Sequence, residues 1–263
     1  MAELGAYLAI GAATGFFAGL LGIGGGTIIV SSLALMFAAH GFPAPFVMHM
    51  AIGTSLAAIV GGAWASFRTH HRHNSVDWPV VRVMVPGLLV GVLAGAVIAR
   101  FSNTTFLKGF FLGFMALIIA QLVLNLKPKT ARPLPGRVGL TAMALFMGVS
   151  SSLFGGGAAA IGVPFLTWCG MTTHRAIGTV AAMGFPVAIA GAIGYGLAGI
   201  SAPGLPPWSV GFVYLPAFVG ISLASVVVAP FGARLAHKLS GPTLRRIFAI
   251  FLIALAVKVG MSI

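Results

Sequence analysis

Long apolar stretches separated by short polar segments run along nearly the whole chain of 263 residues. Several approach the roughly 20 residues that an α-helix needs to cross the hydrocarbon core of a bilayer. Clusters of Gly and Pro, or of Arg and His, mark the loops between them. The pattern predicts helices over residues 5–22, 27–39, 49–67, 79–100, 105–126, 138–154, 158–170, 174–199, 208–232 and 243–262.

Two glycine triplets interrupt this apolar pattern. Gly24–Gly26 separates the first two predicted helices, and Gly155–Gly157 separates the helices at 138–154 and 158–170. Similar hexapeptides follow the triplets: His49–Thr54 reads HMAIGT and His174–Thr179 reads HRAIGT. We interpret the chain as a duplication. It divides into a first membrane repeat at 1–126, a cytoplasmic linker at 127–137 and a second membrane repeat at 138–263.

Composition places this chain in lipid. Apolar residues make up 59% of the sequence and charged residues only 6%, and the mean hydropathy is +1.08. Soluble domains carry about 25% charged residues. The net charge of +13 comes from Lys and Arg in the short loops, where it fits the positive-inside rule better than nucleic-acid binding. The lone Cys169 excludes an internal disulfide. These features predict an all-α integral membrane protein whose partner is the lipid bilayer.

The loop charges predict which segments share a side of the membrane. The stretch at 68–82 and the linker at 127–137 are basic, so we expect both in the cytoplasm, whereas the loop at 200–207 has no Lys or Arg. The helix at 174–199 supplies one crossing between the linker and that outer loop. The two segments around Gly155–Gly157 must therefore supply an even number of crossings, either by both crossing fully or by returning together to their own side.

The short arms after the triplets favour the second arrangement. The arms at 27–39 and 158–170 have about 13 residues, ~20 Å of helix, which is less than the ~30 Å of the hydrocarbon core. Each repeat is then a glycine-broken re-entrant helical hairpin plus three transmembrane helices. Because three is odd, the two repeats are inverted, with both termini outside. Inverted repeats with broken helices are typical of secondary transporters.

The triplets are the main candidates for chemistry. A helix that begins just after a break points unpaired backbone N–H groups and a partial positive charge at its surroundings, which attracts anions. Close packing of small residues is the structural alternative. Nearby hydroxyls could bind a polar ligand or bond back to a helix carbonyl. The candidate substrate-binding residues are Gly24, Gly25, Gly26, Thr27, Ser31, Thr54, Ser55, Gly155, Gly156, Gly157 and Thr179.

Histidines begin the two hexapeptides. His49 and His174 would lie near opposite membrane faces if the repeats are inverted, which suits gating or proton-responsive groups; the alternative is a helix-terminal side chain at the interface. The cluster of His70, His71 and His73 has no Cys, and Asp77 is its only nearby carboxylate, so we interpret it as a solvated loop and expect no metal. We expect no cofactor either.

The scarcity of carboxylates narrows the function further. Glu3 and Asp77 are the only acidic residues, and both lie near segment ends. Cation carriers and proton pumps usually need acidic residues at membrane depth, and an enzyme would lack groups for acid–base catalysis. We therefore predict that the protein is not an enzyme and that its substrate is a small anion.

The combined motifs resemble the TauE/SafE family of sulfite exporters, also called the TSUP family. The likeness covers nearly the whole chain and depends on four pieces in order: Leu21–Gly26 (LGIGGG), Ala51–Ser55 (AIGTS), Asn74–Trp78 (NSVDW) after a basic loop, and the second triplet with Pro164. The resemblance implies a multi-pass carrier of the bacterial inner membrane that moves sulfur-containing anions such as sulfite or organosulfonates.

The sequence therefore favours an exporter of sulfite or an organosulfonate that works by alternating access. Two other hypotheses stay open at this point. A passive anion channel could use the same site, and a non-transporting membrane scaffold could use the glycines for assembly alone.

Overall fold

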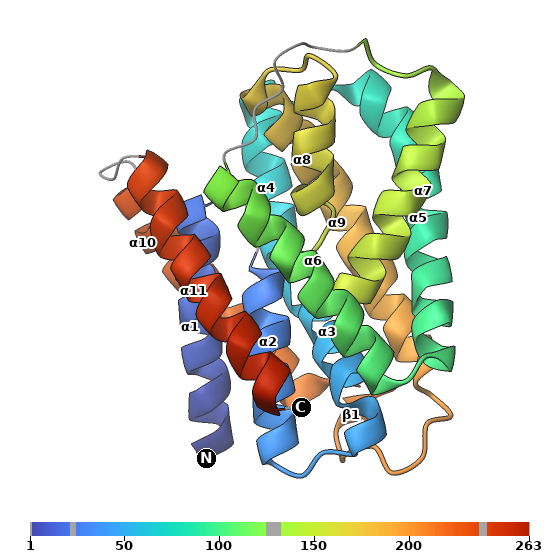
Figure 1. The fold of residues 1–263 in the computed structure, drawn as a ribbon, viewed down its shortest axis with the longest axis vertical. Coiled ribbons are helices and arrows are strands. Elements are labelled where there is room, and N and C mark those ends of the chain that lie inside the picture. The colour runs from blue at the N-terminus through green and yellow to red at the C-terminus, as the bar shows by residue number, and fades with distance from the viewer. Residues whose placement is uncertain (1, 22–24, 125–132, 237–240, 263) are drawn as a thin grey trace.

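The chain forms a bundle of helices in a computed structural model (Figure 1), which describes residues 2–21, 25–124, 133–236 and 241–262. The helices are α1 (Ala2–Leu21), α2 (Gly26–Ala39), α3 (Val47–Ala58), α4 (Val60–Arg72), α5 (Trp78–Phe101), α6 (Thr104–Leu124), α7 (Arg137–Phe154), α8 (Ala159–Trp168), α9 (Thr173–Ala198), α10 (Leu215–Ala236) and α11 (Gly241–Ser262). A short 3₁₀ turn, η1 (Ala44–Phe46), precedes α3, and two short strands, β1 (Ser209–Val210) and β2 (Val213–Tyr214), precede α10.

Most of the predicted helices begin and end within a few residues of those observed. In the described ranges, five helical segments are long and apolar enough to cross a bilayer, and each has few charges. They are Ala44–Arg72, Trp78–Phe101, Thr104–Gln121, Arg137–Phe154 and Thr173–Ala198. The all-α membrane class is therefore confirmed.

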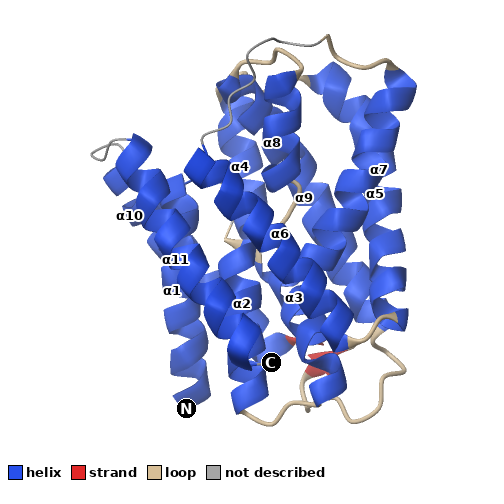
Figure 2. Cartoon of the chain, viewed as in Figure 1, coloured by secondary structure: helices blue, strands red, loops and turns tan. Residues whose placement is uncertain are grey.

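Two boundaries differ from the prediction. The helix predicted over 49–67 is divided at Ile59, where α3 ends and α4 begins. The helix predicted from residue 208 starts only at Leu215, because β1 and β2 pair antiparallel at Val210 and Val213. Gly211 between these strands has a φ of +54°, which a helix does not allow. Figure 2 shows this ribbon at the end of the bundle opposite α8.

Closely packed helix pairs connect the two halves of the sequence. Helix α1 packs along α10, and α5 packs along α7. Glycine permits these approaches: a Cβ at Gly11 would lie 2.6 Å from the carbonyl oxygen of Ile221, and a Cβ at Gly87 would lie 2.8 Å from that of Thr141. Small residues let membrane helices approach closely enough for dispersion to hold them. The first helix of each half, α1 or α7, thus packs on the fourth membrane segment of the other half, α10 or α5, when α3 and α4 are counted as one segment.

The two short helices that follow the triplets lie at opposite ends of the bundle (Figure 1). Helix α2 runs toward the end that holds both chain termini, and α8 runs toward the other end. Their first residues therefore face the middle of the bundle, between the two ends. This placement brings the two glycine breaks, far apart in sequence, into one region.

Candidate functional site

The two triplets touch each other through their backbones. Gly26 is the first residue of α2, and Gly155 follows the last residue of α7. A Cβ at Gly26 would lie 2.5 Å from the carbonyl oxygen of Gly155 and 2.7 Å from the Cα of Gly156. We call Gly25, Gly26, Gly155 and Gly156 the triplet crossing; all four are buried. Gly24 lies outside the described residues.

Glycine is required in the second triplet for backbone conformation as well as for space. Gly155 ends α7 with a φ of +71°, and its N–H donates to the carbonyl of Ser151 at 2.9 Å. Gly157 has a φ of +78°. These left-handed conformations are costly for residues with a Cβ. The chain can therefore leave α7 and enter α8 within four residues.

Two helix N-termini begin at or beside the crossing. Gly25 precedes α2 and Ala158 precedes α8, and neither residue supplies a side-chain cap. Among the described residues, no backbone carbonyl accepts from the N–H groups of Gly26, Thr27, Ala159 or Ala160. The first turn of a helix carries unpaired donors and a partial positive charge. Two such ends therefore present N–H groups close to one crossing.

Ser55 joins the two halves of the crossing. Its hydroxyl lies 3.2 Å from the carbonyl oxygen of Gly26 and 3.0 Å from that of Gly155, and it donates to this pair. Ser55 is fully buried on α3. By satisfying two carbonyls with one proton, it holds the triplets together. Nearby, Thr27 is buried in the first turn of α2, and the hydroxyl of Ser31 donates back to the Thr27 carbonyl at 2.8 Å.

Thr54 and Thr179 make equivalent contacts away from the triplets. Thr54 Oγ1 accepts a hydrogen bond from the N–H of Tyr214 at 3.0 Å, just before α10. Thr179 Oγ1 accepts one from the N–H of Asp77 at 2.9 Å, just before α5. Each threonine thus binds the segment that leads into the fourth membrane segment of the other half. We call these two hydrogen bonds the crossed contacts.

The glycines of the hexapeptides show the same correspondence. A Cβ at Gly53 would lie 2.7 Å from the carbonyl oxygen of Phe212, two residues before Tyr214. A Cβ at Gly178 would lie 2.5 Å from the carbonyl oxygen of Ser75, two residues before Asp77. The recurring Gly-Thr pair therefore has one structural role in both hexapeptides: close approach followed by a hydrogen bond.

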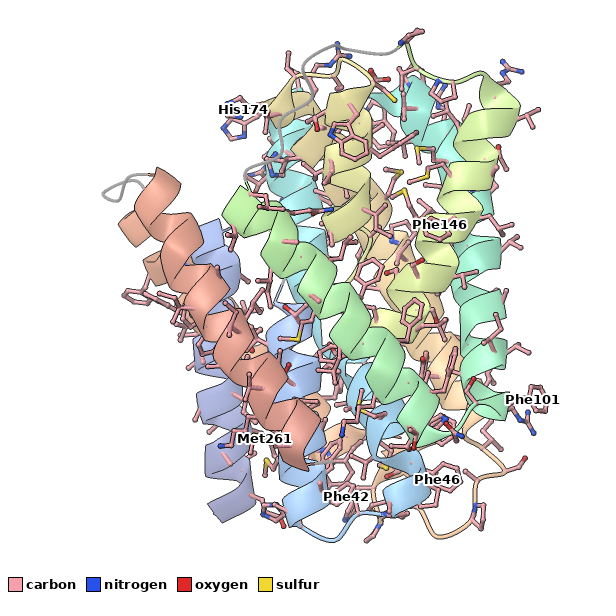
Figure 3. The ribbon with its side chains drawn as sticks, in the orientation of Figure 1. Phe42, Phe46, Phe101, Phe146, His174 and Met261 are labelled. Carbon is pink, nitrogen blue, oxygen red and sulfur yellow. The ribbon has the colours of Figure 1, made fainter. Side chains whose placement is uncertain are left out.

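The two histidines have different surroundings. His49 is buried, and its Nε2 lies 2.8 Å from the carbonyl oxygen of Ala99 and 3.1 Å from that of Ser102, at the end of α5. His174 is exposed. Figure 3 shows His174 at one end of the bundle and Phe46, whose ring contacts that of His49, at the other. The structure therefore places the two histidines near opposite ends.

Asp77 has a second partner at the end that carries His174. Its Oδ2 forms an ion pair of 2.8 Å with Arg175, whose side chain is 57% exposed. Its Oδ1 also accepts from the N–H of Val80 at 3.3 Å, which caps the first turn of α5. His70, His71 and His73 lie at the end of α4, and no group of three His, Cys, Asp or Glu side chains in the described ranges is arranged to hold a metal ion.

The candidate binding residues predicted from the sequence do not include two buried hydroxyls beside the triplets, those of Thr14 on α1 and Ser151 on α7. Neither has a hydrogen-bond partner among the described residues. Their polar character within apolar helices was the available signal. Which way each points depends on helix packing, which the sequence pattern does not give.

An apolar crevice of about 370 Å³ lies elsewhere, between α9, the short strands and α10. It includes no residue of the triplet crossing, and no charged side chain lines it. The lining residues are Ala57, Ala192, Ile193, Gly196, Leu197, Ile200, Val210, Val213, Leu215 and Phe218. A small hydrophilic anion would find no donor side chain there, so the crossing is the better candidate site.

The fold and this site define an α-helical, multi-pass membrane protein with broken helices that meet inside the bundle. Residues 7–259 match the sulfite exporter TauE/SafE family, and the chain belongs to that family. The resemblance inferred from the motifs is confirmed.

Named relatives agree with this family assignment. A "Probable membrane transporter protein" of Haemophilus influenzae is 34% identical over 261 residues, which cover 97% of each chain. The "Probable membrane transporter protein MJ0441" of Methanocaldococcus jannaschii is 24% identical over 90% of this chain and 87% of its own. No solved structure matches the chain. The chain is thus a member of a membrane-transporter family, a class of protein distinct from enzymes.

Proposed function

We propose that this protein exports a small sulfur-containing anion, sulfite or an organosulfonate, across the bacterial inner membrane by alternating access. The observation that carries the proposal is the backbone contact between Gly26 and Gly155 beside the first turns of α2 and α8. The anion binds at the triplet crossing. Backbone N–H groups there replace part of its hydration shell.

The electrostatics of the described chain favour an anion at this place. The N-termini of α2 and α8 provide donors and partial positive charge without any side-chain cap. Asp77 lies at the start of α5, and Glu3 is exposed in the first turn of α1, so neither carboxylate is buried beside the crossing. An anion at the crossing therefore meets donors without a fixed negative charge.

Alternating access needs two gates, and the crossed contacts supply one at each end. Thr54 holds the segment before α10, and Thr179 holds the segment before α5. With both hydrogen bonds formed, the arrangement represents a state closed at both ends. The glycine-broken hairpins act as inverted re-entrant elements, and both termini lie outside. Breaking one crossed contact opens the site to one side only.

Flux through liposomes tests this proposal. Purified protein in vesicles should give saturable uptake of radiolabelled sulfite, and internal unlabelled sulfite should accelerate it by counterflow. Ser55→Ala removes the hydroxyl that bridges Gly26 and Gly155, so it should reduce the flux strongly. Ser222→Ala is the matched control, because the Ser222 hydroxyl donates only to the Ala58 carbonyl, at 3.3 Å.

The outcomes separate the rival functions. No flux of sulfite or of any sulfonate above protein-free vesicles would refute transport of these anions and leave the scaffold hypothesis. Large currents without saturation or counterflow would instead favour a channel. A loss of flux in Ser222→Ala equal to that in Ser55→Ala would show that the crossing has no special role.

A further inference from the structure

Buried polar atoms without partners are rare in proteins, and each one needs an explanation. In the described part of the chain, Thr14 Oγ1 and Ser151 Oγ are two such atoms. Their residues are only 3% and 2% exposed, so bulk water does not satisfy them. Both lie next to a glycine triplet, and each comes from the helix that precedes one of the breaks.

Thr14 lies beside the N-terminus of α2. A Cβ at Gly25, the residue that precedes α2, would overlap the methyl group of Thr14 and would lie 3.2 Å from the Thr14 carbonyl oxygen. The Thr14 side chain therefore occupies the space that a larger residue at position 25 would need. Its hydroxyl, on the same Cβ as that methyl group, lies next to the first turn of α2.

Ser151 has the corresponding place in the helix that precedes the second break. Its carbonyl accepts the N–H of Gly155, which fixes it one turn before the break. Met147, four residues earlier on α7, reaches α8: a Cβ at Gly162 would lie 2.7 Å from Met147 Cε. Residues four apart share a helix face, so Ser151 lies on the same side of α7 as Met147, in the last turn before the break. Gly155, four residues after Ser151, meets Gly26 in the triplet crossing, so this last turn of α7 leads directly into the crossing.

We propose that Thr14 and Ser151 are specificity-determining donors for a small oxyanion at the triplet crossing. Each hydroxyl donates its proton to one oxygen of the anion, and the N–H groups of α2 and α8 bind its other lone pairs. The ligand class is a compact anion with at least two unsubstituted oxygens, as in sulfite. This inference depends on the proposed function, which it deepens by naming one donor from each broken hairpin.

Ser152 provides a matched control. It is buried, and its hydroxyl also lacks a partner in the described ranges. That hydroxyl faces α5, because a Cβ at Gly95 would lie 3.1 Å from Ser152 Oγ. The adjacent serines Ser151 and Ser152 therefore have the same chemistry and similar burial, but neighbouring residues of a helix point about 100° apart around its axis.

The test measures sulfite affinity and thermal stability of the purified full chain. Thr14→Val and Ser151→Ala should each weaken sulfite binding about tenfold or more, because hydrogen bonds to charged groups are strong. The melting temperature without sulfite should stay the same or rise, because the lost hydroxyl had no partner. Ser152→Ala should keep sulfite affinity within about twofold, and Thr14→Ser, which retains a hydroxyl, should keep most of it.

The failures of the two proposals are distinguishable. If the wild-type chain neither binds sulfite or a sulfonate nor transports them, the proposed function fails and this inference fails with it. If the wild-type chain binds sulfite and Thr14→Val and Ser151→Ala bind it equally well, only this inference is overturned. It is also overturned if Ser152→Ala weakens binding as much as Ser151→Ala.

Discussion

The backbone N–H of Asp77 donates a hydrogen bond of 2.9 Å to the hydroxyl of Thr179, and this contact has a counterpart at Thr54 and Tyr214. In both cases a threonine of one half holds the segment before a helix of the other half. The recurrence of the Gly-Thr pair in the sequence therefore has a physical explanation in packing between halves. The two halves are connected through these contacts as well as through the triplets.

The close contact between Gly26 and Gly155 predicts that any side chain at position 26 lowers the stability of the folded protein. Gly26→Ala places a Cβ 2.5 Å from a backbone carbonyl that cannot rotate away. We expect a loss of about 1–3 kcal/mol, typical of overpacking in a buried site, and a lower apparent melting temperature in detergent. Gly113→Ala on α6 is the control, because a Cβ there meets nothing within 4 Å. Equal melting temperatures for both variants would contradict the close approach.

Two substitutions at Asp77 should separate its contribution to helix capping from its contribution to the ion pair. Asp77→Asn keeps an oxygen that can accept from Val80 N–H and loses the ion pair with the exposed Arg175. Exposed pairs contribute about 0–1 kcal/mol, so the melting temperature should change little. Asp77→Ala also removes the cap and should cost about 1 kcal/mol more. Thermal unfolding of the two variants checks this order, and a large loss of equal size in both would show that the ion pair dominates.

Hydropathy predicted most of the fold because long apolar runs in lipid have few alternatives to helix. It missed the ribbon at 209–214, which depends on a close approach between Gly211 and the Gly196 carbonyl. The break at Ile59 was also missed, since apolar residues continue on both sides of it. These features depend on contacts between distant segments, and a local pattern carries no information about such contacts.

The candidate site was predictable to a similar degree. The triplets and Ser55 were identified because glycine runs and hydroxyls are unusual in an apolar chain, and the structure brings Gly26, Gly155 and Ser55 together. The partners of Thr54 and Thr179 were not predictable, because they lie on segments remote in sequence. Thr14 was missed for the same reason: only the packing of α1 places it beside Gly25.

The two histidines should respond differently to truncation. His49→Ala removes a buried ring whose Nε2 donates to carbonyls at the end of α5. We expect a loss of about 2–4 kcal/mol from the lost hydrogen bond and the cavity. His174→Ala changes an exposed side chain and should stay within about 0.5 kcal/mol. Denaturant unfolding of both variants measures this difference, and comparable losses would argue against a structural role peculiar to His49.

The crossed contacts predict that breaking one of them makes the triplet crossing accessible from one membrane face only. Thr179→Val leaves the N–H of Asp77 without its acceptor, and Thr54→Val does the same to the N–H of Tyr214. An unpaired buried donor costs about 1–3 kcal/mol, so each variant should favour opening at its own end. A single cysteine at position 158, placed in a Cys169→Ser background, reports on this opening because Ala158 is 2% exposed and lies beside the second triplet.

A membrane-impermeant thiol reagent added to one face of oriented vesicles makes the measurement. Thr179→Val should speed labelling about tenfold from the face that carries His174, and Thr54→Val should do so only from the opposite face. Thr141→Val is the control, because the Thr141 hydroxyl bonds within α7, to the Arg137 carbonyl at 3.0 Å. If either variant speeds labelling equally from both faces, the two hydrogen bonds are not separate gates, because a gate at one end can expose the site to that end alone.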